Sequence, residues 1–344
     1  MAWKTIGQPN SIDRISRAVV LDRLSHAYLI CGMDGIGKVT FAQDIAKVAN
    51  CLEMPKSSGP CGSCNQCIRI DSHNHTDVFI YDVKKDLDEV GRTTTMVTID
   101  QLREDFLRQV HRKPYEGRTR IFIISSIESM RSEQSNILLK TLEEPPDDVV
   151  IILLARDASN LLSTIVSRCQ VLNLDPVGEL EILEYLGECE LGPEVPIQEI
   201  AKLSRGRPEW AYRAAINPEI LHILEDKLNQ FVGCLIGSLE QRFKLSKDLS
   251  TQFFRDRDGV YEFLDIAMTW TRDVLLSSSE RAGDIVNISH KERIHEFSKM
   301  LSTTDILNIL KLIRMTLGNL RKNVTPSLVL DNFMLKLPVA TSLT

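Results

Sequence analysis

The sequence predicts a parallel α/β domain followed by an all-helical region. Strand-like and helical stretches alternate up to about residue 175, and a phosphate-binding loop motif follows the first strand-like stretch. Beyond Asp175-Pro176 no further strand-like stretch is evident. Strand–helix alternation at this spacing is typical of a parallel sheet flanked by helices. Ligands of such sheets bind at the carboxyl ends of the strands.

The expected strands are short and nearly continuous in Ile, Val, Leu and aromatic residues. This is the pattern of strands that are covered by helices on both faces. The stretches between them have the length and apolar spacing of helices. We therefore expect strands at 26–31, 77–81, 120–124 and 149–154, and helices at 39–50, 99–110 and 134–142.

The second half of the chain is predicted to hold two helical domains. Short helices at 179–189 and 197–203 are punctuated by prolines, and this small domain is expected to end near Asn217-Pro218. Further on, apolar residues recur at helical spacing, which places one apolar face along each helix. Those faces either pack within their own domain or contact another subunit. The predicted division is 1–175, 176–218 and 219–344, and the two apolar stripes are Leu221, Leu224, Leu228, Phe231 and Leu235, and Ile306, Leu310, Ile313, Leu317 and Leu320.

Composition narrows the class of protein. The 344 residues include 41 Lys and Arg against 47 Asp and Glu, a net charge of −6. An acidic chain is a poor candidate for binding nucleic acid by itself. We interpret the basic stretch 108–120 as a solvated loop, and contact with DNA phosphates is the alternative interpretation. The longest apolar run, 149–155, is too short to cross a bilayer, and the N-terminus lacks the apolar core of a secretory signal. The sequence favours a soluble, cytoplasmic protein with no membrane partner.

A phosphate-binding loop is predicted at Gly32 to Lys38. The residues Gly-Met-Asp-Gly-Ile-Gly-Lys match the G-x-x-x-x-G-K motif between an expected strand and an expected helix. The glycines let backbone N–H groups face a phosphate, the lysine adds a positive charge, and the following helix presents its positive end. The candidate nucleotide-binding residues are Gly32, Gly35, Gly37, Lys38 and Thr40. Weak nucleotide binding and a vestigial turn that binds nothing both remain open.

The catalytic part of an ATPase is missing from this motif. Val39 occupies the position where Ser or Thr would bind magnesium, and Thr40 lies one residue too late, since a helix turns by about 100° per residue. The strand at 121–124 ends in Ser125-Ser126, where an ATPase has an aspartate for the metal and a glutamate for water. We therefore expect no magnesium-dependent ATP hydrolysis by the isolated chain.

Four cysteines predict a structural zinc site. Cys51, Cys61, Cys64 and Cys67 lie within seventeen residues, and four thiolates complete the tetrahedral shell of a structural zinc ion. The turn-rich sequence between them would need a metal to fold, so we expect an inserted zinc module at about 50–76. Reduced free thiols and a redox pair are the alternatives. We interpret the nearby His73 and His75 as solvated.

These motifs resemble those of bacterial clamp-loader subunits, which are AAA+ proteins of the DNA polymerase III holoenzyme. Residues 23–32, the phosphate loop, the four cysteines, the Leu-Leu-Lys-Thr-Leu-Glu-Glu-Pro-Pro run at 138–146 and Ser167-Arg168-Cys169 occur in the same order as in that family. The resemblance covers residues 4–218 motif by motif. It implies an AAA+ P-loop domain with an inserted zinc module, a small helical lid domain and an α-helical collar domain for oligomerisation.

Two types of subunit share this layout. Tau/gamma motor subunits hydrolyse ATP, whereas delta-prime subunits often have a degraded site and act as a rigid stator. Val39, Ser125 and Ser126 resemble the second type, as does Glu209, which occupies the position of the motors' sensor arginine. Arg207 is a candidate to compensate for it. The alternatives are a tau/gamma-like motor with a divergent metal site and a stand-alone zinc-dependent nucleic-acid-binding module.

The resemblance also implies a catalytic role in trans for Arg168. In the family, the arginine of this Ser-Arg-Cys motif projects into a neighbouring subunit's ATP site, where a guanidinium stabilises charge on the γ-phosphate. The helix at 134–142, with Lys140 and the following Glu143-Glu144, is implied to face the ring interface; a solvated face is the other interpretation. The implied partners are tau/gamma-like motor and delta-like subunits, with the sliding clamp and primer–template DNA reached through the complex.

Overall fold

The computed structural model describes residues 3–53, 59–82, 99–130, 132–279, 282–322 and 324–340 of the chain. The chain forms two compact units. The first comprises Met1–Glu190 and Ser204–Tyr212, and the second comprises Leu191–Leu203 and Arg213–Thr344. The short helices after residue 178 are therefore shared between the two units. The three-part division at 175 and 218 stays a prediction.

The first unit contains a five-stranded sheet with the order β2-β3-β4-β1-β5, in which every neighbouring pair is parallel. The parallel α/β architecture predicted from the sequence is confirmed. The last strand was not predicted, because it is short and only its two central residues are apolar. The strands are β1 (Ala27–Cys31), β2 (Val78–Asp82), β3 (Arg120–Ser125), β4 (Val149–Ala155) and β5 (Gln170–Asn173).

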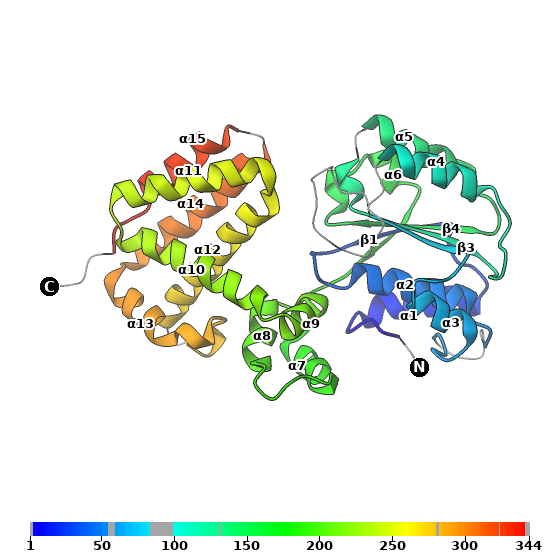
Figure 1. Cartoon of the computed structure of the whole chain (residues 1–344), viewed down its shortest axis with the longest axis horizontal. Coiled ribbons are helices and arrows are strands. Elements are labelled where there is room, and N and C mark those ends of the chain that lie inside the picture. The colour runs from blue at the N-terminus through cyan, green and yellow to red at the C-terminus, as the bar shows by residue number, and fades with distance from the viewer. Residues whose placement is uncertain are drawn as a thin grey trace. The chain divides into compact units, whose positions relative to one another are not determined.

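Helices cover both faces of this sheet (Figure 1). The first face is packed by α1 (Pro9–Val20), α2 (Lys38–Asn50) and α3 (Asn65–Asp71), and the second by α4 (Ile99–Val110), α5 (Ser132–Glu143) and the short α6 (Ser163–Val166). Alternate residues of each strand enter separate apolar clusters, so the strands are buried on both sides. Two 3₁₀ turns, η1 (Ile127–Ser129) and η2 (Ala158–Asn160), follow β3 and β4.

The rest of the chain is helical within the described residues. The short helices α7 (Glu179–Glu188), α8 (Ile197–Ser204) and α9 (Pro208–Ile216) precede six further helices. None of the helices in the ranges given above combines the length and the apolar character needed to cross a membrane. The six are α10 (Glu219–Ile236), α11 (Leu239–Arg255), α12 (Arg257–Ser277), α13 (Lys291–Met300), α14 (Thr303–Arg321) and α15 (Pro326–Lys336), with 3₁₀ turns η3 (Ala282–Asp284) and η4 (Ile288–His290).

The second unit has its own core around Trp270 of α12. Its indole ring packs edge-on against Phe297, with 4.8 Å between the ring centroids. Most residues of the two predicted stripes lie in this core, and the others are half-buried. The stripes therefore pack mainly within their own unit, which is the first of the two interpretations above.

A buried ion pair connects the N-terminal segment to two helices of the first unit. Lys47 and Asp44 of α2 are both fully buried, with 2.7 Å between Nζ and Oδ1, and Lys47 also contacts Asp71 of α3 at 3.0 Å. The other oxygen of Asp44 accepts the backbone N–H groups of Lys4 and Thr5. Since a buried charge without a partner is strongly unfavourable, these groups depend on one another.

Candidate functional site

The phosphate loop lies between β1 and α2, at the carboxyl edge of the sheet. Gly35 and Gly37 have φ values of +76° and +96°, which favour glycine. At Gly35 the space is also closed, because an added Cβ would lie 2.8 Å from Cβ of Trp210 in α9. The backbone N–H of Trp210 donates to the Gly35 carbonyl at 3.1 Å. The loop therefore has the predicted glycine-dependent shape and is braced by α9.

The Lys38 ammonium is bound by the loop itself. Its Nζ lies 2.6 Å from the Gly32 carbonyl, 3.1 Å from the Met33 carbonyl and 3.3 Å from a carboxylate oxygen of Asp34. Asp34 also pairs with Arg156 at 2.5 Å. Burial raises the pKa of Asp34, but the charges of Arg156 and Lys38 outweigh burial and hold this pKa below its usual range. One carboxylate thus pairs with both cations beside the loop.

At the neighbouring strand end, hydroxyl groups occupy the positions where an ATPase has acids. β3 ends at Ser125, and the next residue, Ser126, places its Oγ 3.3 Å from a carboxylate oxygen of Asp82. In η1, one carboxylate oxygen of Glu128 is buried and has no hydrogen-bond partner within the described residues. Asp82 belongs to this strand end because the parallel register places it opposite Ser125, and no motif in the sequence indicates this.

The remaining candidate groups are Thr40, Arg207 and Glu209. Thr40 is half-buried in the first turn of α2. The Arg207 guanidinium stacks over the Trp210 ring at 5.0 Å, and its Nε donates to the Ser204 carbonyl at 2.7 Å. Glu209 lies in the first turn of α9. The compensating role of Arg207 stays a prediction.

Arg168 follows α6 and is held by two contacts. Its Nη1 donates to the Thr164 carbonyl at 3.0 Å, and its Nη2 pairs with Oε1 of Glu143 at 2.7 Å. The arginine side chain is 34% exposed, so it does not belong to the core. Glu143, the last residue of α5, is therefore paired with a cation but remains 52% exposed, so the interpretations as a solvated face and as an interface residue both stay predictions.

The sheet register separates Arg168 from the phosphate loop of its own chain. Gln170 pairs with Tyr28 and Asn173 with Cys31, so β5 begins at the amino edge and the loop after Cys31 leaves the carboxyl edge. Three residue steps of about 3.3 Å each span about 10 Å. Arg168 lies two residues before β5, and both of its contacts are with residues near the amino edge. The contacts of its guanidinium are with Thr164 and Glu143 and not with the loop of the same chain, within the described residues.

The four clustered cysteines converge on one point. Cys51 caps the carboxyl end of α2, Cys64 caps the amino end of α3, and Cys67 lies in the first turn of α3. The four Sγ atoms lie within 4.8 Å of one another, and the pairs Cys61–Cys67 and Cys51–Cys64 are each 4.0 Å apart. Tetrahedral coordination with Zn–S bonds of about 2.3 Å places sulfurs about 3.8 Å apart. The cluster has the dimensions needed to bind a metal such as zinc.

Hydrogen bonds make these thiols unequal. Burial raises the pKa of Cys61, but the backbone N–H groups of Cys64 and Ser63 outweigh it and lower this pKa to about 6. Burial raises the pKa of Cys67 and of Cys51. Cys61 is thus the thiol best prepared to bind a metal as a thiolate, whereas the two buried thiols require a cation to favour ionisation.

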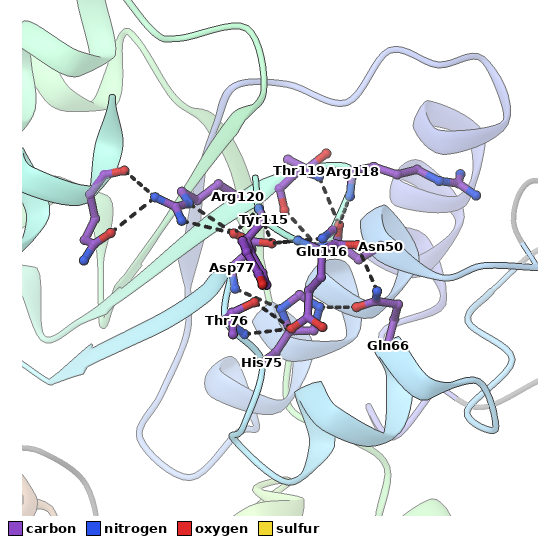
Figure 2. Close-up of polar contacts among 12 residues, drawn as sticks. Asn50, Gln66, His75, Thr76, Asp77, Tyr115, Glu116, Arg118, Thr119 and Arg120 are labelled. Carbon is purple, nitrogen blue, oxygen red and sulfur yellow. Dashed lines mark hydrogen bonds and ion pairs between the residues drawn. The ribbon is translucent and has the colours of Figure 1, made fainter. Parts of the chain in front are cut away.

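A polar network attaches the cysteine-bearing helix α3 to the sheet (Figure 2). Asp77 is fully buried, accepts the backbone N–H groups of Tyr115, Glu116 and Gly117, and pairs with Arg120 at 3.1 Å. The Glu116 side chain in turn pairs with Arg69 of α3. One buried carboxylate therefore organises the loop before β3 and, through it, the position of α3.

Two sequence interpretations are wrong in this network. His75 is only 6% exposed: its Nδ1 accepts the N–H of Asp77, so its Nε2–H points to the Gln66 side chain. Arg120, which was assigned to a solvated basic loop, is buried at the start of β3. Both residues are buried because Asp77 provides them with hydrogen-bonding partners. The other basic residues of the stretch, Arg108, His111, Arg112, Lys113 and Arg118, are exposed as expected.

Comparison with known proteins identifies the family. A family model described as DNA polymerase III, delta subunit, matches residues 7–178. The DNA polymerase III subunit delta' of Bacillus subtilis is 30% identical over 286 residues, which cover 80% of each protein. The chain belongs to the DNA polymerase III delta-prime family. This confirms the delta-prime resemblance seen in the sequence.

Similarity over part of the chain extends to the tau/gamma subunits. The subunit tau/gamma of Haemophilus influenzae is 32% identical over 206 residues, or 58% of this chain, but the match spans only 28% of that protein. A solved structure of a gamma subunit-related protein from Thermotoga maritima aligns over 96% of this chain and 98% of its own, with 16% identity and a TM-score of 0.39. The Bacillus subtilis delta' match thus covers a larger share of both sequences than the Haemophilus influenzae tau/gamma match.

Proposed function

We propose that this delta-prime family member is a non-hydrolysing stator subunit of a replicative clamp loader, in which Arg168 acts in trans on ATP bound by a neighbouring motor subunit. Family membership supports an accessory role in the DNA polymerase III holoenzyme. In this role the chain is not an ATPase by itself but completes the active site of a motor subunit.

The observation that carries the proposal is the location of Arg168. Its guanidinium is partly exposed and lies at the opposite sheet edge from the phosphate loop of its own chain. A guanidinium forms charge-assisted hydrogen bonds to phosphate oxygens and stabilises the charge that develops during phosphoryl transfer. A phosphate bound by a neighbouring subunit is the target that suits this location.

The state of the phosphate loop supports the absence of hydrolysis. Lys38 is bound by loop carbonyls and Asp34, and β3 ends in hydroxyls. Hydroxyl groups cannot replace both a metal-binding carboxylate and a general base. We therefore assign Gly32, Gly35, Gly37, Lys38 and Thr40 to a weak or vestigial nucleotide site.

We also propose that the four thiolates of Cys51, Cys61, Cys64 and Cys67 hold one structural zinc ion. Four protein ligands leave no open position for substrate, which indicates a structural rather than a catalytic role. The ion would fix the end of α2 to the start of α3 and complete the inserted module at about 50–76. The Sγ distances support this assignment.

The proposed partners follow from the role in the complex. The chain would assemble in the cytoplasm with tau/gamma-like motor and delta-like subunits, and the helical region 219–344 would provide the oligomerisation surface. The region 176–218 would act as the small lid domain. The sliding clamp and primer–template DNA would be reached through the complex.

The test compares Arg168→Ala with Arg17→Ala, an exposed arginine of the same unit, in the complex reconstituted with motor and delta-like subunits. We expect both variants to assemble, and Arg168→Ala alone to lower DNA-stimulated ATP turnover about tenfold or more. Clamp loading should fall in parallel. Unchanged loading by Arg168→Ala would refute the trans role. ATP hydrolysis by the isolated chain that Lys38→Ala abolishes would instead indicate a motor subunit.

A further inference from the structure

We infer that Glu143 is a positioning residue for Arg168, and that its carboxylate orients the guanidinium for the neighbouring subunit's triphosphate. This inference rests on the proposed trans role of Arg168. It assigns a function to the glutamate that ends α5.

The two contacts of Arg168 fix the orientation of its guanidinium plane. Glu143 Oε1 binds Nη2 at 2.7 Å and the Thr164 carbonyl binds Nη1 at 3.0 Å, so two elements hold two different nitrogens. Each contact uses one N–H of its nitrogen, and each terminal nitrogen of arginine carries two. Within the described part of the chain, the second N–H on each nitrogen and the Nε–H therefore remain available for phosphate oxygens.

Packing holds both partners of this ion pair in place. Leu138 and Leu142 are buried against the sheet and fix the rotation of α5, and Pro145-Pro146 prevent the helix from continuing past Glu143. Ile165 is buried and anchors α6, and the backbone N–H of Arg168 donates to its carbonyl at 3.1 Å. The backbones of Glu143 and Arg168 are thus set by separate core contacts, and the ion pair fixes only the arginine side chain.

Because the Glu143–Arg168 pair is exposed, its effect on the orientation of the guanidinium can be distinguished from an effect on folding stability. Glu143 is 52% exposed, and exposed ion pairs contribute little to folding. An arginine side chain has large rotamer freedom, which a fixed partner removes before the phosphate arrives. A carboxylate close to the triphosphate would also repel it. If repulsion were the larger effect, removal of the charge would raise turnover, so the direction of the change decides the inference.

The experiment uses the reconstituted complex and varies only this chain. Glu143→Gln removes the charge while it keeps the shape, and Glu143→Asp keeps the charge at a shorter reach. Asp147→Asn removes an exposed carboxylate just beyond the prolines and serves as the matched control. Each is compared with Arg168→Ala and with the Glu143→Gln, Arg168→Ala double variant. The readouts are kcat and KM for DNA-stimulated ATP hydrolysis, assembly, and the thermal midpoint of the free chain.

We expect Glu143→Gln to lower kcat about three- to thirtyfold, the range for the freedom of one long side chain, with little change in KM, assembly or thermal midpoint. Glu143→Asp should recover part of the loss, Asp147→Asn should match the wild type, and the double variant should equal Arg168→Ala. If Arg168→Ala lowers kcat while Glu143→Gln does not, the inference is wrong and the proposed function stands. A lower thermal midpoint or failed assembly for Glu143→Gln would also refute it, and an unaffected Arg168→Ala would refute the proposed function itself.

Discussion

Asp34 shows how a single side chain can change the property of a loop that matches the phosphate-binding motif. A phosphate loop attracts anions through its N–H groups and its lysine. Here a carboxylate within the loop contacts Lys38 at 3.3 Å and Arg156 at 2.5 Å. A nucleotide phosphate must compete with this resident anion for both cations. The loop can therefore keep its backbone shape and still bind nucleotide poorly.

Asp34→Asn is expected to increase the affinity of the isolated chain for ATP about three- to tenfold. The estimate corresponds to the removal of one negative charge about 4 Å from a phosphate in a solvent-rich environment. A fluorescent ATP analogue titrated into the isolated chain measures the change. Asp148→Asn, which removes an exposed carboxylate at the amino edge of the sheet, should have no effect. Equal or weaker binding by Asp34→Asn would show that Asp34 does not control access to the loop.

For single residues, the sequence predicts a role where the residue belongs to a motif of fixed short spacing. The glycines of the loop and the four cysteines are recognised because their partners lie a few positions away. His75 and Arg120 were misinterpreted because their partner Asp77 matters through burial, and burial depends on the packing of α3 and β3. The Glu143–Arg168 pair also joins distant positions, and nothing in the sequence alone indicates it.

Among the helices, α2 combines the most functions. It begins at the phosphate loop, ends at Cys51, and holds the buried Asp44–Lys47 pair in between. Asp44 fixes the N-terminal segment through Lys4 and Thr5, and Lys47 reaches Asp71 of α3. The position of α2 therefore determines both the loop and the cysteine cluster.

Lys47→Met should destabilise the first unit by about 3–5 kcal/mol, because it leaves Asp44 as a buried charge without its partner. Lys4→Met is the matched control: Lys4 contacts the same Asp71, but its side chain is 59% exposed. An exposed pair contributes at most about 1 kcal/mol. Denaturant unfolding of the two variants measures the difference. Equal effects of the two substitutions would mean that the buried pair is not a major stabilising contact.

The sequence predicts elements well where the apolar run is long. β4 is buried at every position, and its seven residues form one uninterrupted apolar run. β5 has four residues, of which Gln170 and Asn173 are polar, and it becomes a strand through its pairing with β1. The seven-residue α3 lies in a turn-rich region, and its position depends on the cysteines and on the Asp77 network.

For the whole molecule, the division into two compact units means that a substitution in one unit should change mainly the stability of that unit. The cysteine cluster belongs to the first unit, whereas Cys234 is buried in the core of the second. Sequence patterns locate the change from α/β to helical structure near residue 175. They do not show that the short helices after this point divide between the two units, because that depends on contacts between distant segments.

Removal of zinc should therefore affect only one of two thermal transitions. We expect about one zinc ion per chain, which is lost on Cys61→Ser or on treatment with a chelator. Loss of the ion should lower the midpoint temperature of the first unit's transition by about 10 °C or more, because a structural zinc site contributes several kcal/mol of folding free energy. Calorimetry and metal analysis measure both. Cys234→Ser identifies which transition belongs to which unit. It places a hydroxyl in the core of the second unit, so it should lower the midpoint temperature of that unit's transition and leave the zinc content unchanged. A metal-free wild-type chain with both transitions unchanged would exclude zinc and leave four reduced thiols as the description of the cluster.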